Sequence, residues 1–147
     1  MIRALAAAGL ALLLTAGPLT AAELRVEVGG LHNSVGLVRV ALFRTPGDFA
    51  KEEGVYREAV VPAVVPAATL VFTDIPPGIY GLAAFHDENA DGKFDRGFLG
   101  IPREGYGFGN DAPVLLDAPP FEQAAVAIAE PLARTMLRMR YWLESAN

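Results

Sequence analysis

The sequence predicts an all-β domain, an antiparallel arrangement of about seven short strands that is typical of a β-sandwich or a barrel. Two observations predict it. Several segments alternate apolar and polar residues with a period of two, which in an extended chain places one set of side chains in a core and the other in solvent. Glycine and proline clusters separate these segments, and a proline inside a helix costs about 3 kcal/mol, which argues against a helical bundle.

The expected strands follow one another with turn residues between them. The first two cover residues 24–28 and 38–42, where valine and leucine at alternate positions share one face. A third covers 70–72 and leads into the turn Asp74-Ile75-Pro76-Pro77-Gly78. Residues 79–85 are apolar on both faces, so we expect this strand at the centre of a sheet. Shorter strands are expected at 114–116, 124–128 and 137–141.

Residues 49–59 have no clear strand pattern. Lys51, Glu52 and Glu53 can begin one helical turn, but Gly54 interrupts it, and a loop fits this segment equally well. We therefore assign no strand to this part of the chain.

The first 22 residues have the layout of a secretory signal peptide. Arg3 gives a positive start, residues 4–14 form an apolar run broken by Gly9, and Thr20-Ala21-Ala22 supplies the small residues that a signal peptidase requires. The apolar run is about half of the roughly 20 residues needed to span a bilayer, which argues against a retained anchor. We expect an exported chain over 23–147, one β-sandwich domain without a transmembrane segment, in the periplasm or secreted.

The amino-acid composition argues against several kinds of chemical activity and binding partner. The chain has no cysteine, so it has no disulfide, no thiolate chemistry and no lipid anchor on a cysteine. Its net charge of −5 gives no reason to expect nucleic-acid binding, and the arginines near the C-terminus fit a solvated strand face. The expected partner is an unknown envelope protein or a small or polymeric ligand.

The most informative segment is the acidic stretch that follows the expected central strand. It contains D-x-N-x-D-G-x-x-D, which matches the first nine positions of a calcium-binding loop, with Gly92 at the sharp turn. Calcium takes six to eight oxygen ligands. The spacing offers the side chains of Asp87, Asn89 and Asp91, the carbonyl of Lys93, and Asp95 directly or through water. The sequence therefore predicts a structural Ca²⁺ site.

The match ends at position twelve, where Phe98 stands in place of the usual bidentate glutamate. A closing carboxylate would come from Glu88, Glu104 or Asp111, and the sequence does not choose between them. Without the bidentate ligand we expect a dissociation constant of about 10⁻⁴–10⁻³ M, as in extracellular modules. The alternative is a polar turn that holds no metal, because aspartate, asparagine and glycine are favoured in turns for their own reasons.

A glycine–aromatic segment follows, in which Gly105, Gly107 and Gly109 alternate with Tyr106 and Phe108. It lacks the G-x-G-x-x-G spacing of a dinucleotide loop. We expect a structural role, with glycines in strained backbone conformations and aromatic rings covering the edge of the core. The alternative is that the two aromatic side chains form an exposed surface for a ligand or partner.

Four segments, residues 72–80, 86–95, 99–108 and 119–124, resemble a secreted bacterial family catalogued as domain of unknown function 2141. The resemblance covers essentially the whole expected mature chain. It departs at Gly109, where the family commonly has serine. The resemblance implies an exported β-sandwich of the immunoglobulin-like or prealbumin-like kind, and it implies no established activity, catalytic residue or ligand.

Catalytic candidates are few. Ser34 lies close to His32 in the sequence, but the G-x-S-x-G motif of serine hydrolases is absent. The only indication of a zinc site is His86 beside Asp87. Clustered carboxylates fit a cation site better than a glycosidase pair. We therefore predict a non-enzymatic module that acts by binding. The alternative is an enzyme of unrecognised type with a site near His86 and Glu104.

Overall fold

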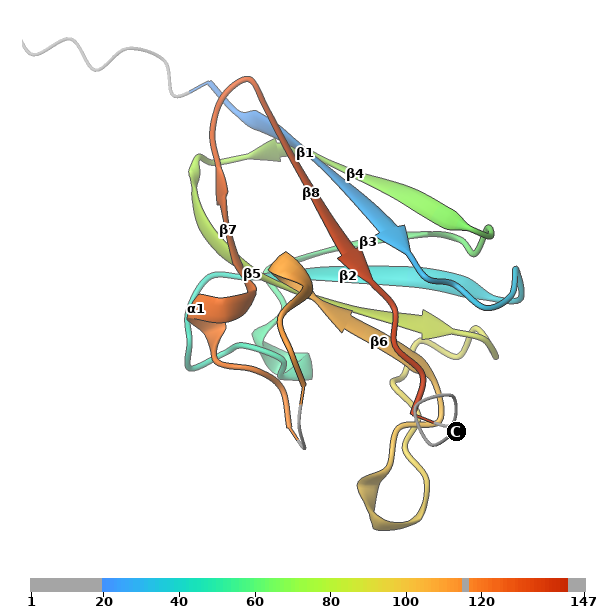
Figure 1. The fold of residues 1–147 in the computed structure, drawn as a ribbon. Coiled ribbons are helices and arrows are strands. Elements are labelled where there is room, and N and C mark those ends of the chain that lie inside the picture. Colours follow the sequence, from blue (N-terminus) through green and yellow to red (C-terminus); the bar gives the residue numbers. More distant parts are fainter. Residues whose placement is uncertain (1–19, 115–116, 143–147) are drawn as a thin grey trace, which may run out of the picture.

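The computed structural model describes residues 20–114 and 117–142, which form two β-sheets that pack face to face (Figure 1). The smaller sheet has the strand order β4-β1-β8, with β1 (Ala22–Gly29), β4 (Ala67–Ile75) and β8 (Leu132–Arg138). The larger sheet contains β3 (Arg57–Pro62), β2 (Leu37–Phe43), β5 (Gly78–Asp87), β6 (Gly105–Phe108) and β7 (Ala125–Ile128). The predicted all-β sandwich is confirmed.

Helical structure is confined to single turns in the described residues. These turns are η1 (Glu52–Gly54), η2 (Phe98–Gly100), η3 (Gly109–Asp111) and α1 (Phe121–Ala124). The η1 turn falls in the segment where the sequence allowed one turn of helix. Within the same described residues, no helix has the length and apolar character needed to cross a bilayer.

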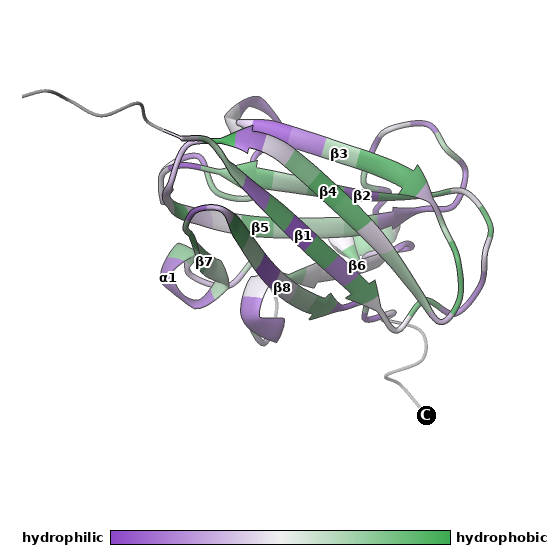
Figure 2. Ribbon diagram, turned by 90° about the horizontal axis from the view of Figure 1, so that it is seen from above, coloured by the Kyte–Doolittle hydropathy of each residue, from purple (hydrophilic) through white to green (hydrophobic). Residues whose placement is uncertain are grey.

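Alternation along β1 shows why these residues form a strand. Leu24, Val26 and Val28 are buried in the core between the sheets, while Arg25 and Glu27 face solvent. Figure 2 shows the resulting hydrophobic and hydrophilic bands along β1. Removing such a side chain from water stabilises the fold by about 1.5–3 kcal/mol relative to an exposed position.

Strand β5 is central, as predicted. It pairs with β2 on one edge, and on the other edge it pairs with β7 near its start and with β6 near its end. Its last two residues, His86 and Asp87, are completely buried although both are polar. The end of β5 therefore places two polar side chains inside the core.

All strand pairs are antiparallel except β1 with β8, which is parallel. The chain leaves β7 and enters β8 at the same end of the sandwich at which β1 begins. The backbone N–H of Glu23 donates to the carbonyl of Pro131 there, at 3.0 Å. The entry point sets the direction of β8, so the antiparallel prediction is wrong for this one pair.

Strand β3 was not predicted. It is an edge strand whose side chains are exposed or half-buried. Ala59 and Val61 pack against the core, but Val60 between them is also apolar, so the alternation that marks a strand in a sequence is absent. Pro62 fits at its end because an edge strand does not need every ladder donor. Residues 105–108 also form a strand that the sequence did not predict.

Other boundaries differ slightly from the prediction. Ala124 ends α1, so β7 begins one residue later than expected. Strand β8 spans Leu132–Arg138, so it begins before and ends before the expected strand at 137–141. Val114 is not in a strand, and residues 115–116 of that expected strand lie outside the described residues. Residues 1–19 of the expected signal peptide also lie outside them, and Ala22 at its end belongs to β1.

Candidate functional site

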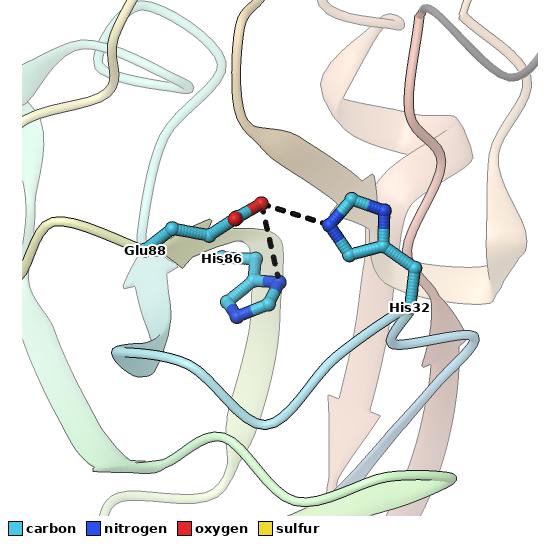
Figure 3. Close-up of side chains that lie close together, drawn as sticks. All are labelled: His32, His86 and Glu88. Atoms are coloured by element: carbon cyan, nitrogen blue, oxygen red, sulfur yellow. Dashed lines mark hydrogen bonds and ion pairs between the residues drawn. The ribbon is translucent and has the colours of Figure 1, made fainter.

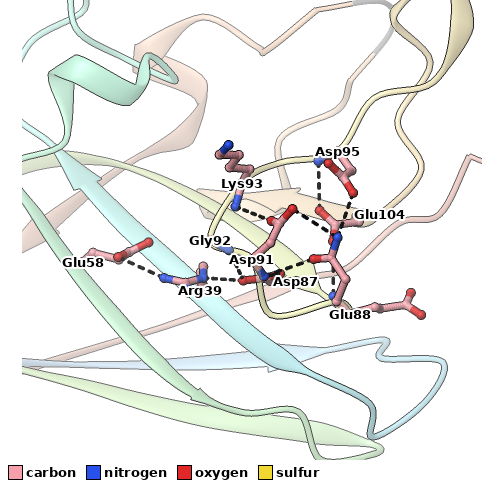
Figure 4. A network of polar contacts seen from close by, with 10 residues as sticks. Arg39, Glu58, Asp87, Glu88, Asp91, Gly92, Lys93, Asp95 and Glu104 are labelled. Atoms are coloured by element: carbon pink, nitrogen blue, oxygen red, sulfur yellow. Dashed lines mark hydrogen bonds and ion pairs between the residues drawn. The ribbon is translucent and has the colours of Figure 1, made fainter.

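The end of β5 opens into an acidic loop, which we define as residues 87–95. Asp87 holds this loop together from a completely buried position (Figure 4). Its Oδ2 accepts hydrogen bonds from Arg39 Nε at 2.7 Å and from the backbone N–H of Gly92 at 3.0 Å. Its Oδ1 accepts from the backbone N–H of Asp91 at 3.1 Å. Both carboxylate oxygens of Asp87 are therefore used within the protein.

Arg39 supplies the countercharge for Asp87 from the neighbouring strand β2. The hydrogen bond to Asp87 raises the pKa of the Arg39 guanidinium above its ordinary value, against the effect of burial, and Glu58 adds to the rise. The Nη1 of Arg39 lies 3.4 Å from Glu58 on β3. Three adjacent strands thus contribute to one line of charges, Glu58–Arg39–Asp87.

The exposed side of the acidic loop brings together the three other predicted side-chain ligands. Asn89 Nδ2 lies 3.2 Å from Asp91 Oδ2 and 3.0 Å from Asp95 Oδ2. The backbone N–H of Asp91 donates to Asn89 Oδ1 at 3.2 Å. Lys93 joins through its backbone N–H, which donates to Asp91 Oδ1 at 2.8 Å. The sequence spacing therefore found side chains that converge, although Asp87 faces inward from them.

Of the three closing carboxylates that the sequence left open, Glu104 ties the two ends of the loop together. Its Oε1 accepts from the backbone N–H of Glu88 at 3.2 Å and its Oε2 from that of Asp95 at 3.0 Å. Burial raises the pKa of the Glu104 carboxyl, although these backbone hydrogen bonds act in the opposite direction. Asp111 instead accepts from the backbone N–H of Arg138 at 3.0 Å.

Glu88 turns away from the acidic loop toward two histidines, and we call His32, His86 and Glu88 the histidine cluster (Figure 3). Glu88 Oε1 lies 2.9 Å from His32 Nε2 and 3.9 Å from His86 Nδ1. One nitrogen of each ring and one Glu88 oxygen lie within 4.8 Å of one another. Burial opposes ionisation of Glu88, but hydrogen bonds from His32 and Asn33 outweigh it and lower the pKa of the carboxyl.

His86 has a defined tautomer in this cluster. Its Nε2 lies 2.6 Å from the carbonyl oxygen of Val35, and its Nδ1 lies 2.7 Å from the hydroxyl of Tyr141. A carbonyl only accepts hydrogen bonds, so Nε2 carries a proton, and in the neutral imidazole Nδ1 is the nitrogen with the lone pair. The Tyr141 ring also stacks on His32, with 3.7 Å between ring centroids.

Sequence reasoning considered His32 beside Ser34 and did not pair it with His86. Ser34 Oγ instead accepts a hydrogen bond from the backbone N–H of Val65 at 3.0 Å. His32 reaches His86 because the loop between β1 and β2 lies over the end of β5, where Val38 pairs with His86. Only the strand register could have revealed this proximity.

An aromatic groove runs over the face of the larger sheet that points away from the core. Its volume is about 710 Å³, and charged side chains such as Arg39, Lys93, Arg96 and Glu58 also line it. The rings that line it are those of Phe43, Phe49, Phe85, Phe94, Tyr106, Phe108 and Trp142. Several of these rings contact one another: the Phe94 and Tyr106 ring centroids, for example, are 6.1 Å apart. The groove therefore borders the acidic loop at Lys93 and Phe94.

The alternation of glycine and aromatic residues in β6 builds one wall of this groove. Gly105 and Gly107 face the core, where a Cβ would lie 2.3 Å from the Tyr141 ring and 2.6 Å from the Arg138 carbonyl oxygen, respectively. Tyr106 and Phe108 consequently point outward and are half-buried. The glycines serve close approach rather than strained backbone conformations, which corrects that part of the expectation, because none of the three has a positive φ.

Comparison with known proteins identifies a bacterial family. The model of a family described as "Uncharacterized protein conserved in bacteria (DUF2141)" matches residues 26–135, about three quarters of the chain. No curated protein and no solved structure matches the chain significantly. The matched range includes the acidic loop, the histidine cluster and β6.

Proposed function

Since the chain belongs to the bacterial family DUF2141, of which no activity is described, we propose a function from the geometry of the site. The protein is an exported, non-enzymatic binding module. It holds a ligand with a flat apolar face, such as a sugar or aromatic ring, in the aromatic groove, and Ca²⁺ braces the acidic loop beside that groove. The aromatic groove is the observation that carries the proposal.

The groove has the size and lining of a small-molecule site. Ligand sites typically measure about 300–1,000 Å³ and combine apolar walls with a few polar groups, and the groove has about 710 Å³. Ring–ring contacts fix its walls: Phe49 lies 5.9 Å from Phe108 and Phe85 lies 5.7 Å from Phe94, between centroids. The rings are therefore positioned before a ligand arrives, which lowers the entropic cost of binding.

Trp142 is the single tryptophan of the chain and it lines the groove, so its fluorescence reports occupancy. We expect soluble oligosaccharides or the aromatic dye ANS to change this fluorescence saturably. Phe94→Ala and Tyr106→Ala are expected to weaken the response, while Val71→Ala on the outer face of the smaller sheet leaves it unchanged. A response that is equal in all variants would contradict binding in the groove.

The acidic loop offers a ligand set that fits Ca²⁺. The Asn89 amide nitrogen donates hydrogen bonds to Asp91 Oδ2 at 3.2 Å and to Asp95 Oδ2 at 3.0 Å, so both carboxylates already point at this one side chain. Rotation of the amide by half a turn would present its oxygen beside the two carboxylates, and oxygens are the ligands that Ca²⁺ takes. The amide oxygen of Asn89, the two carboxylates and the Lys93 carbonyl would hold the ion. Asp87 is left out of this set because its oxygens already bind Arg39 and the loop backbone.

Calcium binding is tested by thermal unfolding with and without millimolar Ca²⁺. With a dissociation constant in the expected range, about 10 mM Ca²⁺ raises the free energy of unfolding by about 1–3 kcal/mol through mass action. Asp91→Asn and Asp95→Asn abolish the increase, and Glu27→Gln, an exposed carboxylate on β1, retains it. An unchanged melting temperature in the wild type would contradict Ca²⁺ binding, but it would not bear on ligand binding in the aromatic groove.

The contacts near His86 and Glu104 favour binding over the enzyme alternative. His86 is completely buried, and both of its ring nitrogens have hydrogen-bond partners. Both carboxylate oxygens of Glu104 accept backbone N–H groups. A general acid or base needs to reach the proton that it transfers, whereas Glu104 holds the acidic loop and His86 is shielded from solvent.

A further inference from the structure

We propose that the histidine cluster binds a divalent transition-metal ion, zinc or copper, with His32, His86 and Glu88 as the protein ligands. Two imidazoles and one carboxylate form a ligand set that both metals accept. The cluster uses none of the side chains assigned to Ca²⁺ and lies outside the aromatic groove. The inference is therefore independent of the proposed function.

The distances place the cluster close to metal-binding geometry. Ligands about 2.0–2.2 Å from a tetrahedral zinc ion are separated by about 3.3 Å. Glu88 Oε1 is 2.9 Å from His32 Nε2 and 3.9 Å from His86 Nδ1, on either side of that value. The side chains of His32 and Glu88 are each 32% exposed, so small rotations at the surface equalise the distances and the ion has access from solvent.

His86 is oriented as metal-binding histidines usually are. Such a histidine donates its second ring N–H to a carboxylate or a backbone carbonyl, which fixes the tautomer and the direction of the ligating nitrogen. The Val35 carbonyl performs this role, and complete burial holds the ring in place. Nδ1 therefore faces the Tyr141 hydroxyl at 2.7 Å, with Glu88 Oε1 3.9 Å away.

Tyr141 closes the fourth side of the cluster. Its hydroxyl lies 2.7 Å from His86 Nδ1 and its ring stacks on His32. When an ion binds, the hydroxyl gives up the Nδ1 lone pair, and its oxygen or a water takes the fourth position. The ion would connect the β1–β2 loop, the end of β5 and the C-terminal segment, which are far apart in the sequence.

The test is calorimetric titration of the protein, purified without a histidine tag, with Zn²⁺ and Cu²⁺ separately. We expect one ion per chain, with Cu²⁺ bound more tightly than Zn²⁺. His32→Ala and Glu88→Gln are expected to weaken binding by about tenfold or more. Asp91→Asn, which removes a calcium ligand, leaves the affinity for both metals unchanged, so the two metal proposals fail separately.

A spectroscopic readout identifies the ligands directly. The electron paramagnetic resonance spectrum of the Cu²⁺ complex should show coupling to two imidazole nitrogens, and to one in His32→Ala. His32 and Glu88 lie at the surface, so circular dichroism of these variants should match the wild type, whereas a His86 variant tests folding as well. Absence of saturable binding at millimolar metal, or binding that is unaffected by His32→Ala, would overturn the site.

Discussion

On β6, the positions that face the core require the smallest side chain, and the positions that face outward carry large aromatic ones. The inward positions, Gly105 and Gly107, have no room for a Cβ because the C-terminal segment crosses there. The outward positions carry Tyr106 and Phe108, whose rings form a wall of the groove. One four-residue strand therefore provides both a close approach to the C-terminal segment and part of the candidate ligand surface.

Gly105→Ala tests this packing. The added Cβ would lie 2.3 Å from the Tyr141 ring, and such overpacking costs about 1–3 kcal/mol of the free energy of unfolding. Urea denaturation followed by circular dichroism measures the change. Gly29→Ala is the matched control, because nothing lies within 4 Å of its Cβ position, and we expect a change of less than about 0.5 kcal/mol. Equal stability of the two variants would contradict the close approach.

We expect the ionisation of Tyr80 to reduce the stability of the protein at alkaline pH. Burial raises the pKa of its hydroxyl, which donates to the Pro76 carbonyl at 2.8 Å, and Tyr56 raises it further. The folded state therefore keeps this proton after the unfolded state has lost it, at a pKa of about 10. Stability from this group is complete below pH 10 and is lost as pH rises from there to the folded pKa.

The measurement for Tyr80 is the free energy of unfolding by urea between pH 8 and pH 11. Tyr80→Phe is expected to cost about 0.5–1.5 kcal/mol at pH 8 through the lost hydrogen bond, and to decline less steeply than the wild type above pH 10. Parallel curves for the two proteins would show that Tyr80 does not cause the decline. The difference between the curves removes the contribution of the other alkaline groups.

At the scale of elements, the acidic loop is a continuation of β5 that is held by its neighbours. Arg39 on β2 binds the first residue of the loop, and Glu104, just before β6, binds the backbone at both ends. The loop is therefore ordered by charges from the two strands that flank β5. This explains how a polar segment leaves a buried strand without an unpaired buried polar atom among the described side chains.

Asp87→Asn is expected to be the most damaging single change in the loop. It removes the negative charge 2.7 Å from Arg39 and leaves one amide oxygen to accept from three N–H donors, and removing one member of a buried ion pair costs about 3–5 kcal/mol. Because Arg39 retains some exposure, we expect about 2–4 kcal/mol by urea denaturation. Asp91→Asn, at an exposed position, is the control and should cost less than about 1 kcal/mol. Equal losses would show that Asp87 does not organise the loop.

At the scale of the molecule, the sequence predicts the strands whose apolar residues form a recognisable pattern. The segments that became β1, β2, β4 and β7 were predicted because alternation marks a half-buried strand, and β5 because it is apolar on both faces. Strand β3 has three apolar residues in a row, so it shows no alternation, and β6 has glycine where an inward apolar residue would signal a strand. The direction of β8 depends on how the chain crosses between sheets, which no local pattern encodes.

In the candidate site too, the sequence predicted some contacts, and others became apparent only in the structure. Spacing within one segment predicted that Asn89, Asp91 and Asp95 converge, since these residues are neighbours in the chain. The link between Asp87 and Arg39 and the meeting of His32 with His86 depend on strand register, so they required the structure. The groove likewise gathers rings from several segments, and sequence reasoning identified Tyr106 and Phe108 alone as a possible surface.

The pairing of β1 with β8 has a consequence for biogenesis. Residues 23–29 find their parallel neighbours at 132–138, so the three-stranded sheet stays incomplete until residue 138 has been synthesised. Such sequence-distant pairing slows folding. Until then one border of β1 is a template for association with other nascent chains.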